Sequence, residues 1–200
     1  MIQLVMSKKT EYPEELITNM LLKIGENPDR PGLIDTPKRV IKMWKEIFRG
    51  YDPEQKPKVA IFKNGMDGLV YDQMIIDEGN FYSHCEHHMV PFFGNYHFAY
   101  IPDKAGNIIG LSKVARIVDY HAAKLQIQER LVHDIIENIW EELCKDVVCP
   151  IGMGLLMTGE HLCKTMRGVK KKGKMTTIKL KGAFYDNPAV KSEFLQRCRI

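Results

Sequence analysis

Residues 95–101, Asn-Tyr-His-Phe-Ala-Tyr-Ile, decide the fold class, because large aromatic side chains alternate there with smaller or more polar ones. Tyr96, Phe98 and Tyr100 recur with a period of two, which places them on one face of a β-strand. A strand with one aromatic face is typical of an antiparallel sheet that packs on a core through that face. The segment therefore predicts such a sheet.

The pattern around this segment extends the prediction. Further strands are expected at residues 59–62, 69–77, 152–161 and 175–181. Between them, one helix is expected to begin at Ser112, and a longer one carries an apolar stripe at helical spacing. A short helix is expected from Pro188. Two helices inserted between groups of strands indicate an α+β fold with an antiparallel sheet, not an alternating parallel α/β fold.

The first fifty residues are predicted to form a helical region of their own. Apolar residues recur at helical spacing from Leu16 to Ile24 and stop at Gly25. Thr36-Pro37 is an N-cap residue followed by proline, a typical helix start. We therefore expect an N-terminal helical region over residues 1–50 and a second domain, which contains the sheet, over residues 51–200.

Composition excludes several protein classes. The net charge is +4, from 29 basic and 25 acidic residues, which does not indicate a nucleic-acid partner. No apolar stretch is long enough to span a bilayer, and residues 1–10 lack a signal-peptide layout, so a cytoplasmic protein without a membrane partner is expected. Five cysteines do not resemble a secreted disulfide framework, and Cys144, Cys149 and Cys198 are expected to be free thiols.

A cluster of thiol and imidazole groups predicts a metal site. Cys85 and His88 have a Cys-x-x-His spacing that can close on one ion, and Cys163 supplies a third ligand. If residues 161–163 continue a strand, His161 and Cys163 face the same side. Three protein ligands leave a position open for water, and His87 and His161 remain for proton transfer. The alternatives are a structural zinc site, or free thiols with unrelated histidines.

Hydroxyl and cationic groups form a second set of candidates. Residues 110–116, Gly-Leu-Ser-Lys-Val-Ala-Arg, surround a predicted helix N-terminus, where backbone N–H groups favour anions. The alternative is an ordinary capped helix with solvated charges. The candidate phosphate-binding residues are Ser112, Lys113, Arg116, Arg167, Arg39 and Lys42.

A carboxylate on a predicted helix is the third candidate. Glu129 lies in residues 126–130, Gln-Ile-Gln-Glu-Arg. A carboxylate can accept two parallel hydrogen bonds from the N1–H and 2-amino groups of guanine. The alternative is a solvated helix charge.

These pieces together resemble the GTP cyclohydrolase I family over residues 15–197. The matching motifs occur in the family's order, with similar spacing. They are Thr36-Pro37-Lys38-Arg39-Val40, Cys85-Glu86-His87-His88, Gly110-Leu111-Ser112-Lys113, Gln128-Glu129-Arg130-Leu131, His161-Leu162-Cys163 and Met166-Arg167-Gly168-Val169.

The resemblance implies a zinc-dependent hydrolase that opens the guanine ring of GTP and gives 7,8-dihydroneopterin triphosphate and formate. It implies the tunnelling fold, an antiparallel sheet with two long helices, with an N-terminal helical extension and assembly into a homodecamer with sites at subunit boundaries. By position, Cys85, His88 and Cys163 are similar to the zinc ligands, and His87 and His161 to the proton-transferring histidines. The residues similar to those that hold guanine are Gln128 and Glu129; those similar to the triphosphate cradle are Ser112, Lys113, Arg116, Arg167, Arg39 and Lys42.

Two other readings stay open at this point. One is a different enzyme of the tunnelling fold, such as a pterin synthase with three zinc-binding histidines or a nitrile reductase with a catalytic cysteine and no zinc. The other is a non-catalytic module of that fold that binds a pterin or a purine nucleotide. Cys85 with His88 and Cys163 favours neither enzyme, and the spare His87 and His161 disfavour the module.

Overall fold

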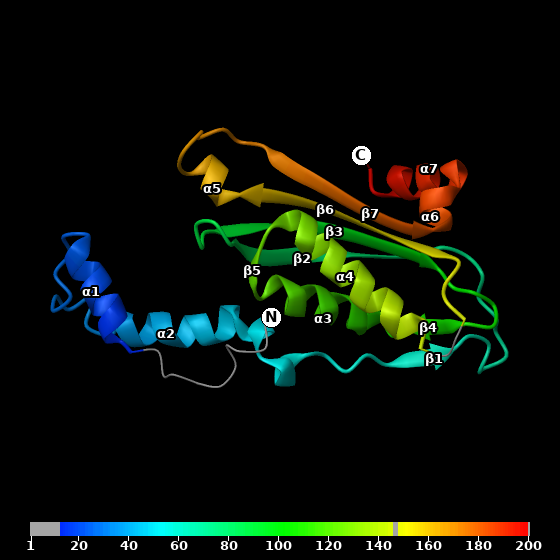
Figure 1. Ribbon diagram of the computed structural model, residues 1–200, viewed down its shortest axis with the longest axis horizontal. Helices are drawn as coiled ribbons and strands as arrows, with labels where there is room; N and C mark the ends of the chain where they lie inside the picture. The colour runs from blue at the N-terminus through cyan, green and yellow to red at the C-terminus, as the bar shows by residue number, and fades with distance from the viewer. Residues whose placement is uncertain (1–12, 146–147, 200) are drawn as a thin grey trace, which may run out of the picture. The chain divides into compact units, whose positions relative to one another are not determined.

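The computed structural model describes residues 13–145 and 148–199 (Figure 1). The chain divides into two compact units, residues 1–48 and 49–200. Within the described ranges, no helix is both long enough and apolar enough to cross a membrane.

The first unit contains two helices, α1 (Glu15–Lys23) and α2 (Thr36–Ile47), which contact each other. Ile17 of α1 and Ile41 of α2 are buried. Asp35, and not Thr36, occupies the N-cap position of α2, and its side chain makes no capping hydrogen bond. The expected helix start is therefore shifted by one residue, with the following proline in the first turn.

The second unit contains two β-sheets, five α-helices and two short 3₁₀ helices among its described residues. In chain order its elements are η1 (Arg49–Tyr51), η2 (Pro53–Gln55), β1 (Ile61–Lys63), β2 (Ile75–Cys85), β3 (Pro91–Ile101), β4 (Asn107–Ile109), α3 (Leu111–Ala122), β5 (Leu125–Gln126), α4 (Gln128–Leu143), β6 (Gly152–His161), α5 (Leu162–Thr165), β7 (Lys174–Gly182), α6 (Ala183–Asp186) and α7 (Pro188–Arg197). Counted by residues, α3 and α4 are the long helices; α5 and α6 are single turns.

The main sheet has the strand order β5-β2-β3-β6-β7. The three long pairings, β2–β3, β3–β6 and β6–β7, are antiparallel, and the short β5 runs parallel to β2. A separate antiparallel pair joins β1 and β4. The α+β class with an antiparallel-rich sheet, expected from the sequence, is confirmed.

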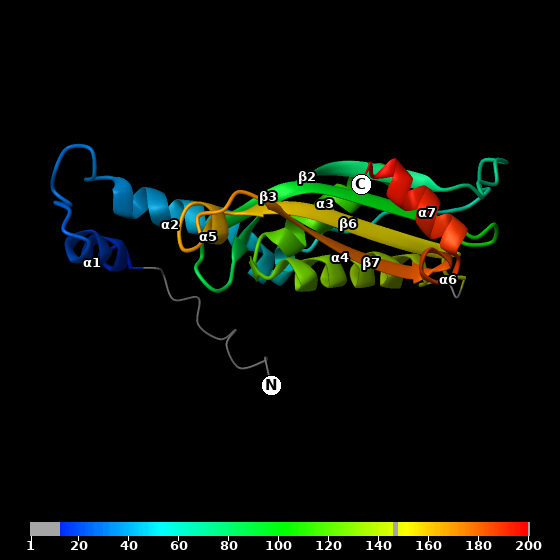
Figure 2. The ribbon, with the colours of Figure 1, turned by 90° about the horizontal axis from the view of Figure 1, so that it is seen from above.

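Helices cover both faces of the sheet (Figure 2). The helices α3 and α4 pack on the face that carries Phe98, Tyr100 and Leu155, where these side chains form the main core. On the opposite face, α6 and α7 bury Phe184 and Phe194 against β3 and β6. The aromatic alternation of residues 96–100 thus does face a core, as predicted.

The strand expected at residues 69–77 begins later and ends later, as β2. The reason is local. The Asn64 side chain accepts a hydrogen bond from the Tyr71 N–H at 2.9 Å and donates to the Tyr71 carbonyl at 2.7 Å. A side chain therefore satisfies the backbone of Tyr71, which needs no neighbouring strand there.

Two of the cysteines expected to be free thiols are bonded to each other. The Cα atom of Cys144, which follows α4, lies 4.4 Å from the Cα atom of Cys149, and a disulfide joins the two residues. The sequence spacing alone did not indicate this bond. Cys85, Cys163 and Cys198 are free.

Candidate functional site

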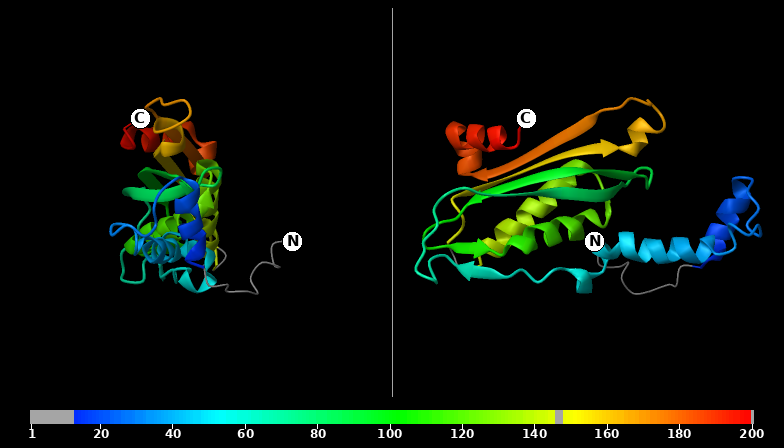
Figure 3. Two further views of the ribbon diagram at one scale, coloured as in Figure 1. Left: turned by 90° about the vertical axis from the view of Figure 1, so that its left-hand side faces the viewer. Right: turned by 180° about the vertical axis from the view of Figure 1, so that it is seen from behind.

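The candidate site lies at one end of the main sheet. There β2 ends at Cys85, a short turn leads into β3 at Pro91, and β6 ends at His161. Strand pairing places Phe92 of β3 opposite His161, so the three strand ends meet. The turn between β2 and β3 lies beside α5, as Figure 1 and the right-hand view of Figure 3 show, and the ligand atoms of His88 in the turn and Cys163 in α5 are within 4.8 Å of each other.

Two thiols and an imidazole come together at this end. The ligand atoms of Cys85, His88 and Cys163 all lie within 4.8 Å of one another. Sγ of Cys85 is 4.0 Å from Nδ1 of His88. The sequence predicted that Cys163 would continue the strand, and this prediction is wrong. Cys163 lies instead in the short helix α5, which directs its thiol toward Cys85. Two sulfurs and one nitrogen are the ligand types that zinc prefers, and three ligands leave a fourth position open.

The electrostatics of the thiols also favour a cation. Burial raises the pKa of the Cys163 thiol, and the neighbouring Cys85 thiol raises that pKa further. Two sulfurs that share a site resist ionisation when no positive charge lies between them. A divalent cation removes this penalty, because it stabilises both thiolates.

Two further imidazoles flank the group of ligands. Nδ1 of His87 is 3.6 Å from Sγ of Cys85, and the His87 side chain is exposed. His161 stacks on Phe92, with ring centroids 4.5 Å apart and planes 5° from parallel. Burial lowers the pKa of His161, although the nearby carboxylate of Glu129 opposes the shift. His161 is therefore neutral near pH 7 and can take up a proton.

Both polar atoms of the Gln128 side chain have hydrogen-bond partners within the protein. Its side chain is buried, and its amide nitrogen lies 3.0 Å from the carbonyls of Met157 and Met175 and from Oγ1 of Thr177. Its amide oxygen lies 2.9 Å from Nε2 of His161. The sequence predicted a contact between Gln128 and a guanine ring; in the structure, its polar atoms orient His161 and join α4 to β6 and β7.

The next two candidates lie around the same group. Glu129 is exposed on the first turn of α4, close enough to act on the pKa of His161. Arg167 follows α5, and its Nη1 donates to Nε2 of His88 at 3.0 Å. The structure thus brings Glu129 and Arg167 to the thiol and imidazole groups.

Ser112, Lys113 and Arg116 lie in the first half of α3, and the last turn of this helix is the part near the end of the sheet that holds Cys85. Ser112 lines an open hollow of about 370 Å³ beside the middle of β2. At the other end of α3, the Ala122 carbonyl accepts a hydrogen bond from Ser83 at 2.8 Å, two residues before Cys85. Ser112 lies roughly 15 Å along the helix axis from Ala122. One copy of the chain therefore does not bring Ser112 next to Cys85.

The remaining candidates belong to the first unit. Arg39 and Lys42 lie one turn apart on α2, and both are exposed. Nη2 of Arg39 pairs with Oδ2 of Asp35 at 3.0 Å.

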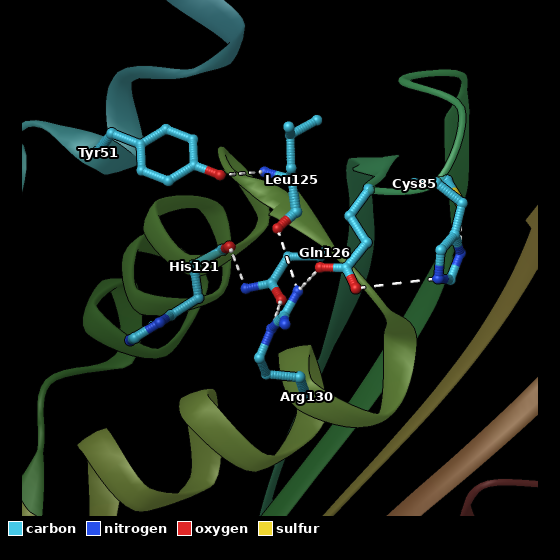
Figure 4. A network of polar contacts seen from close by, with 8 residues as sticks. Tyr51, Cys85, His121, Leu125, Gln126 and Arg130 are labelled. Carbon is cyan, nitrogen blue, oxygen red and sulfur yellow. Dashed lines mark hydrogen bonds and ion pairs between the residues drawn. The ribbon is translucent and has the colours of Figure 1, made fainter. Parts of the chain in front are cut away.

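A polar network that the sequence did not indicate lies next to the site. Arg130 binds Glu86, Gln126 and the Leu125 carbonyl, and Gln126 in turn binds the His121 carbonyl (Figure 4). Glu86 and Arg130 are both in quoted motifs, but their pairing needs the contact between β2 and β5, which no local spacing shows.

Comparison with known proteins identifies relatives along nearly the whole chain. The family model described as GTP cyclohydrolase I matches residues 13–199. The protein named GTP cyclohydrolase 1 from Chlorobium phaeovibrioides is 41% identical over 192 residues, which cover 94% of this chain and 81% of the relative. Proteins of the same name from Sinorhizobium fredii and Leptospira biflexa are each 43% identical and cover 93% of this chain. The matches span 87% and 97% of those two relatives.

One solved structure is a more distant match. The archaeosine synthase QueF-Like in the apo form covers 55% of this chain and 93% of its own, with 15% identity and a TM-score of 0.42. That score is too low to assign a shared fold.

Proposed function

Since the chain belongs to the GTP cyclohydrolase I family, we propose that it opens the guanine ring of GTP by hydrolysis and gives 7,8-dihydroneopterin triphosphate and formate. The observation that carries this proposal is the grouping of Cys85, His88 and Cys163 beside His87 and His161, at the start of the helix that bears Glu129. A metal-activated water, proton carriers and a guanine-reading carboxylate are what this reaction requires.

The proposed metal is zinc. The donor set supports zinc, because two thiols and one imidazole suit it better than the oxygen-binding cations, and the ligand atoms lie within 4.8 Å of one another. Bound there, zinc would act as a Lewis acid that lowers the pKa of water toward neutrality.

The two imidazoles are proposed to move protons at the ring being opened. The Nε2 contact of His161 with the Gln128 amide oxygen favours a proton on Nε2, which leaves Nδ1 as the acceptor. The parallel Phe92 ring holds the plane of His161. His87 is exposed beside Cys85 and can exchange protons with solvent. One imidazole is thus fixed and the other accessible.

Glu129 is proposed to bind the guanine edge. Its exposed carboxylate can accept hydrogen bonds from N1–H and the 2-amino group, while the buried Gln128 acts on the same reaction by holding His161. This proposal assigns different roles to the two residues, although the family resemblance implies that both hold the guanine ring.

Arg167 is proposed to contact the triphosphate. If His88 binds the metal through Nδ1, its Nε2 carries the proton and no longer accepts from Arg167. The guanidinium then becomes available to phosphate oxygens, which it binds well. Ser112, Lys113 and Arg116, with Arg39 and Lys42, complete the proposed cradle. The triphosphate is not cleaved, so these cations position the substrate.

The separation of Ser112 from Cys85, at opposite ends of α3, supports a site in which the two groups come from different copies of the chain. We therefore propose a homo-oligomer with the site between copies, specifically the decamer and the tunnelling fold that the family resemblance implies.

The proposal is tested by incubating purified protein with GTP and zinc and measuring formate and, after oxidation, pterin fluorescence. We expect equimolar formate and pterin from the parent protein, and neither from Cys163→Ser. A protein that binds GTP and releases no formate would be a nucleotide-binding module instead.

A further inference from the structure

The turn between β2 and β3 carries two of the site imidazoles, but the backbone hydrogen bonds within this turn join its residues only to one another. The N–H of Cys85 donates to the Val90 carbonyl at 2.9 Å, and the N–H of Met89 donates to the Cys85 carbonyl at 2.7 Å. Met89 has a positive φ of 55°, in the left-handed region that a tight turn requires. These bonds shape the turn and do not fix its place relative to α4.

Glu86 connects this turn to the segment that leads into α4. Its N–H donates to the Gln126 carbonyl at 3.0 Å, and its carboxylate accepts a close hydrogen bond from Nη2 of Arg130. Nε of Arg130 donates to Oε1 of Gln126 at 2.9 Å, and Nη2 also reaches the Leu125 carbonyl at 3.4 Å (Figure 4). The planar guanidinium thus bridges the turn, β5 and the first turn of α4.

Gln126 and Leu125, the two β5 partners of Arg130, are themselves held by other elements. Gln126 is buried, and its Nε2 donates to the carbonyl of His121 at the end of α3 at 3.1 Å. The N–H of Leu125 donates to the Tyr51 hydroxyl at 3.0 Å. Arg130 therefore binds a segment held by two other elements, and only Glu86 on its far side belongs to the turn.

The pair is too exposed to matter chiefly for stability. The side chains of Arg130 and Glu86 retain 42% and 34% of their exposure. Ion pairs at such positions typically contribute about 0–1 kcal/mol to the free energy of unfolding. The rigid guanidinium of Arg130, which donates to several acceptors, instead restricts the relative positions of the segments that it joins. A misplacement of about 1 Å at a reacting centre can cost on the order of a hundredfold in rate.

We propose that Arg130, through Glu86, is a positioning residue: it holds the turn bearing His87 and His88 at a fixed place relative to the α4 turn bearing Glu129. This inference rests on the proposed function, because it assigns the imidazoles and the carboxylate to one substrate. It adds two residues, Glu86 and Arg130, to the reaction's machinery without giving either a contact to GTP.

The test compares Arg130→Met with the parent at saturating zinc. Methionine retains much of the aliphatic part of the arginine side chain and removes the guanidinium group. We expect kcat for formate release to fall about tenfold or more, with the KM for GTP changed less than about threefold, because the groups remain present but misaligned. The matched control is Lys104→Met, which breaks an exposed ion pair to Asp72 of 3.0 Å remote from these contacts. It should leave both constants unchanged.

A conservative pair of variants separates positioning from folding. Glu86→Gln keeps an oxygen that accepts from Arg130 and should retain kcat within about threefold, whereas Glu86→Ala should lose about as much as Arg130→Met. If Arg130→Met does not fold, the Glu86 pair decides, because it leaves the bonds of Arg130 to Gln126 and Leu125 in place.

A second readout does not depend on activity. Amide hydrogen exchange in metal-free protein should accelerate about tenfold or more at residues 86–89 in Arg130→Met, and not in the strands of the sheet. A kcat within twofold of the parent, or unchanged exchange in this turn, would overturn the inference. If the parent itself released no formate, the proposed function would fail, and the exchange result would still show whether Arg130 holds the turn.

Discussion

Gln128 and Glu129 show at the residue scale why neighbours in a motif take different roles. Consecutive residues on a helix point about 100° apart, so a helix lying on a sheet buries one and exposes the other. Gln128 is buried against β6, where Gly159 leaves room: a Cβ there would lie 2.6 Å from Oε1 of Gln128. Glu129 is exposed. The sequence located both residues at the site but could not tell which of them faces a ligand.

This division predicts different effects on substrate choice. Inosine lacks the 2-amino group, so a carboxylate that pairs with the guanine edge is left partly unpaired by ITP. Loss of one hydrogen bond to a charged group costs about 1.5–3 kcal/mol, and the parent should therefore prefer GTP over ITP by roughly ten- to a hundredfold. Glu129→Ala should lose most of that preference, measured as the ratio of the two dissociation constants.

The contrasting variant is Gln128→Ala. It removes the partner of His161 and should lower kcat, yet retain the preference for GTP. If Glu129→Ala kept the parent's ratio while Gln128→Ala lost it, the two roles would be reversed.

At the scale of elements, α3 and α4 are joined by a half-buried polar contact. Nε2 of His121, near the end of α3, lies 3.0 Å from Oδ1 of Asn138 on α4, and Nδ1 of His121 is buried without a partner. Burial lowers the pKa of His121; the bond to Asn138 opposes this, and Lys124 and Lys56 add to the lowering while Asp134 opposes it. The imidazole is therefore kept neutral in the folded protein.

The burial of His121 predicts a pH effect on the stability of the protein. The unfolded chain binds a proton at His121 as the pH falls through about 6.5, while the folded protein resists it. The contribution is therefore present above pH 6.5 and is lost as the pH falls below it. Thermal midpoints at pH 7.5 and 5.5 should differ less in His121→Gln than in the parent.

His133→Gln is the control, since His133 is 54% exposed on the next helix. It should leave the parent's difference between the two midpoints unchanged. Equal differences in the parent and in His121→Gln would contradict the effect of burial.

The elements themselves were largely predictable, because they follow from periodic burial. The apolar residues that recur at helical spacing in α4 are fully buried, and β6 has the bounds that the sequence predicted. The errors have local causes: a side chain that satisfies the Tyr71 backbone, a short helix in place of a strand at Cys163, and a disulfide between Cys144 and Cys149. The pairing of Glu86 with Arg130 joins segments far apart in sequence, which periodicity does not report.

At the scale of the whole molecule, the candidate residues fall into separate groups. Cys85, His88, Cys163 and Glu129 gather at one end of the sheet, whereas Ser112 lies beside the middle of β2. We propose that these groups form one site for GTP, with each site completed by a second copy of the chain. A head-to-tail arrangement of identical copies meets this requirement and closes into a ring when its rotation permits.

The most direct test of this claim is complementation between two inactive variants. Cys85→Ser lacks a metal ligand, and Arg116→Ala lacks a proposed phosphate contact. They are co-expressed with different tags, and mixed oligomers are purified through both. If each site takes its metal ligands from one copy and Arg116 from another, random mixing restores both groups at about a quarter of the sites. Formate release from GTP, measured well below the parent's KM, should then recover to about a quarter of the parent's rate. Activity no greater than the sum of the two variants alone would contradict the claim.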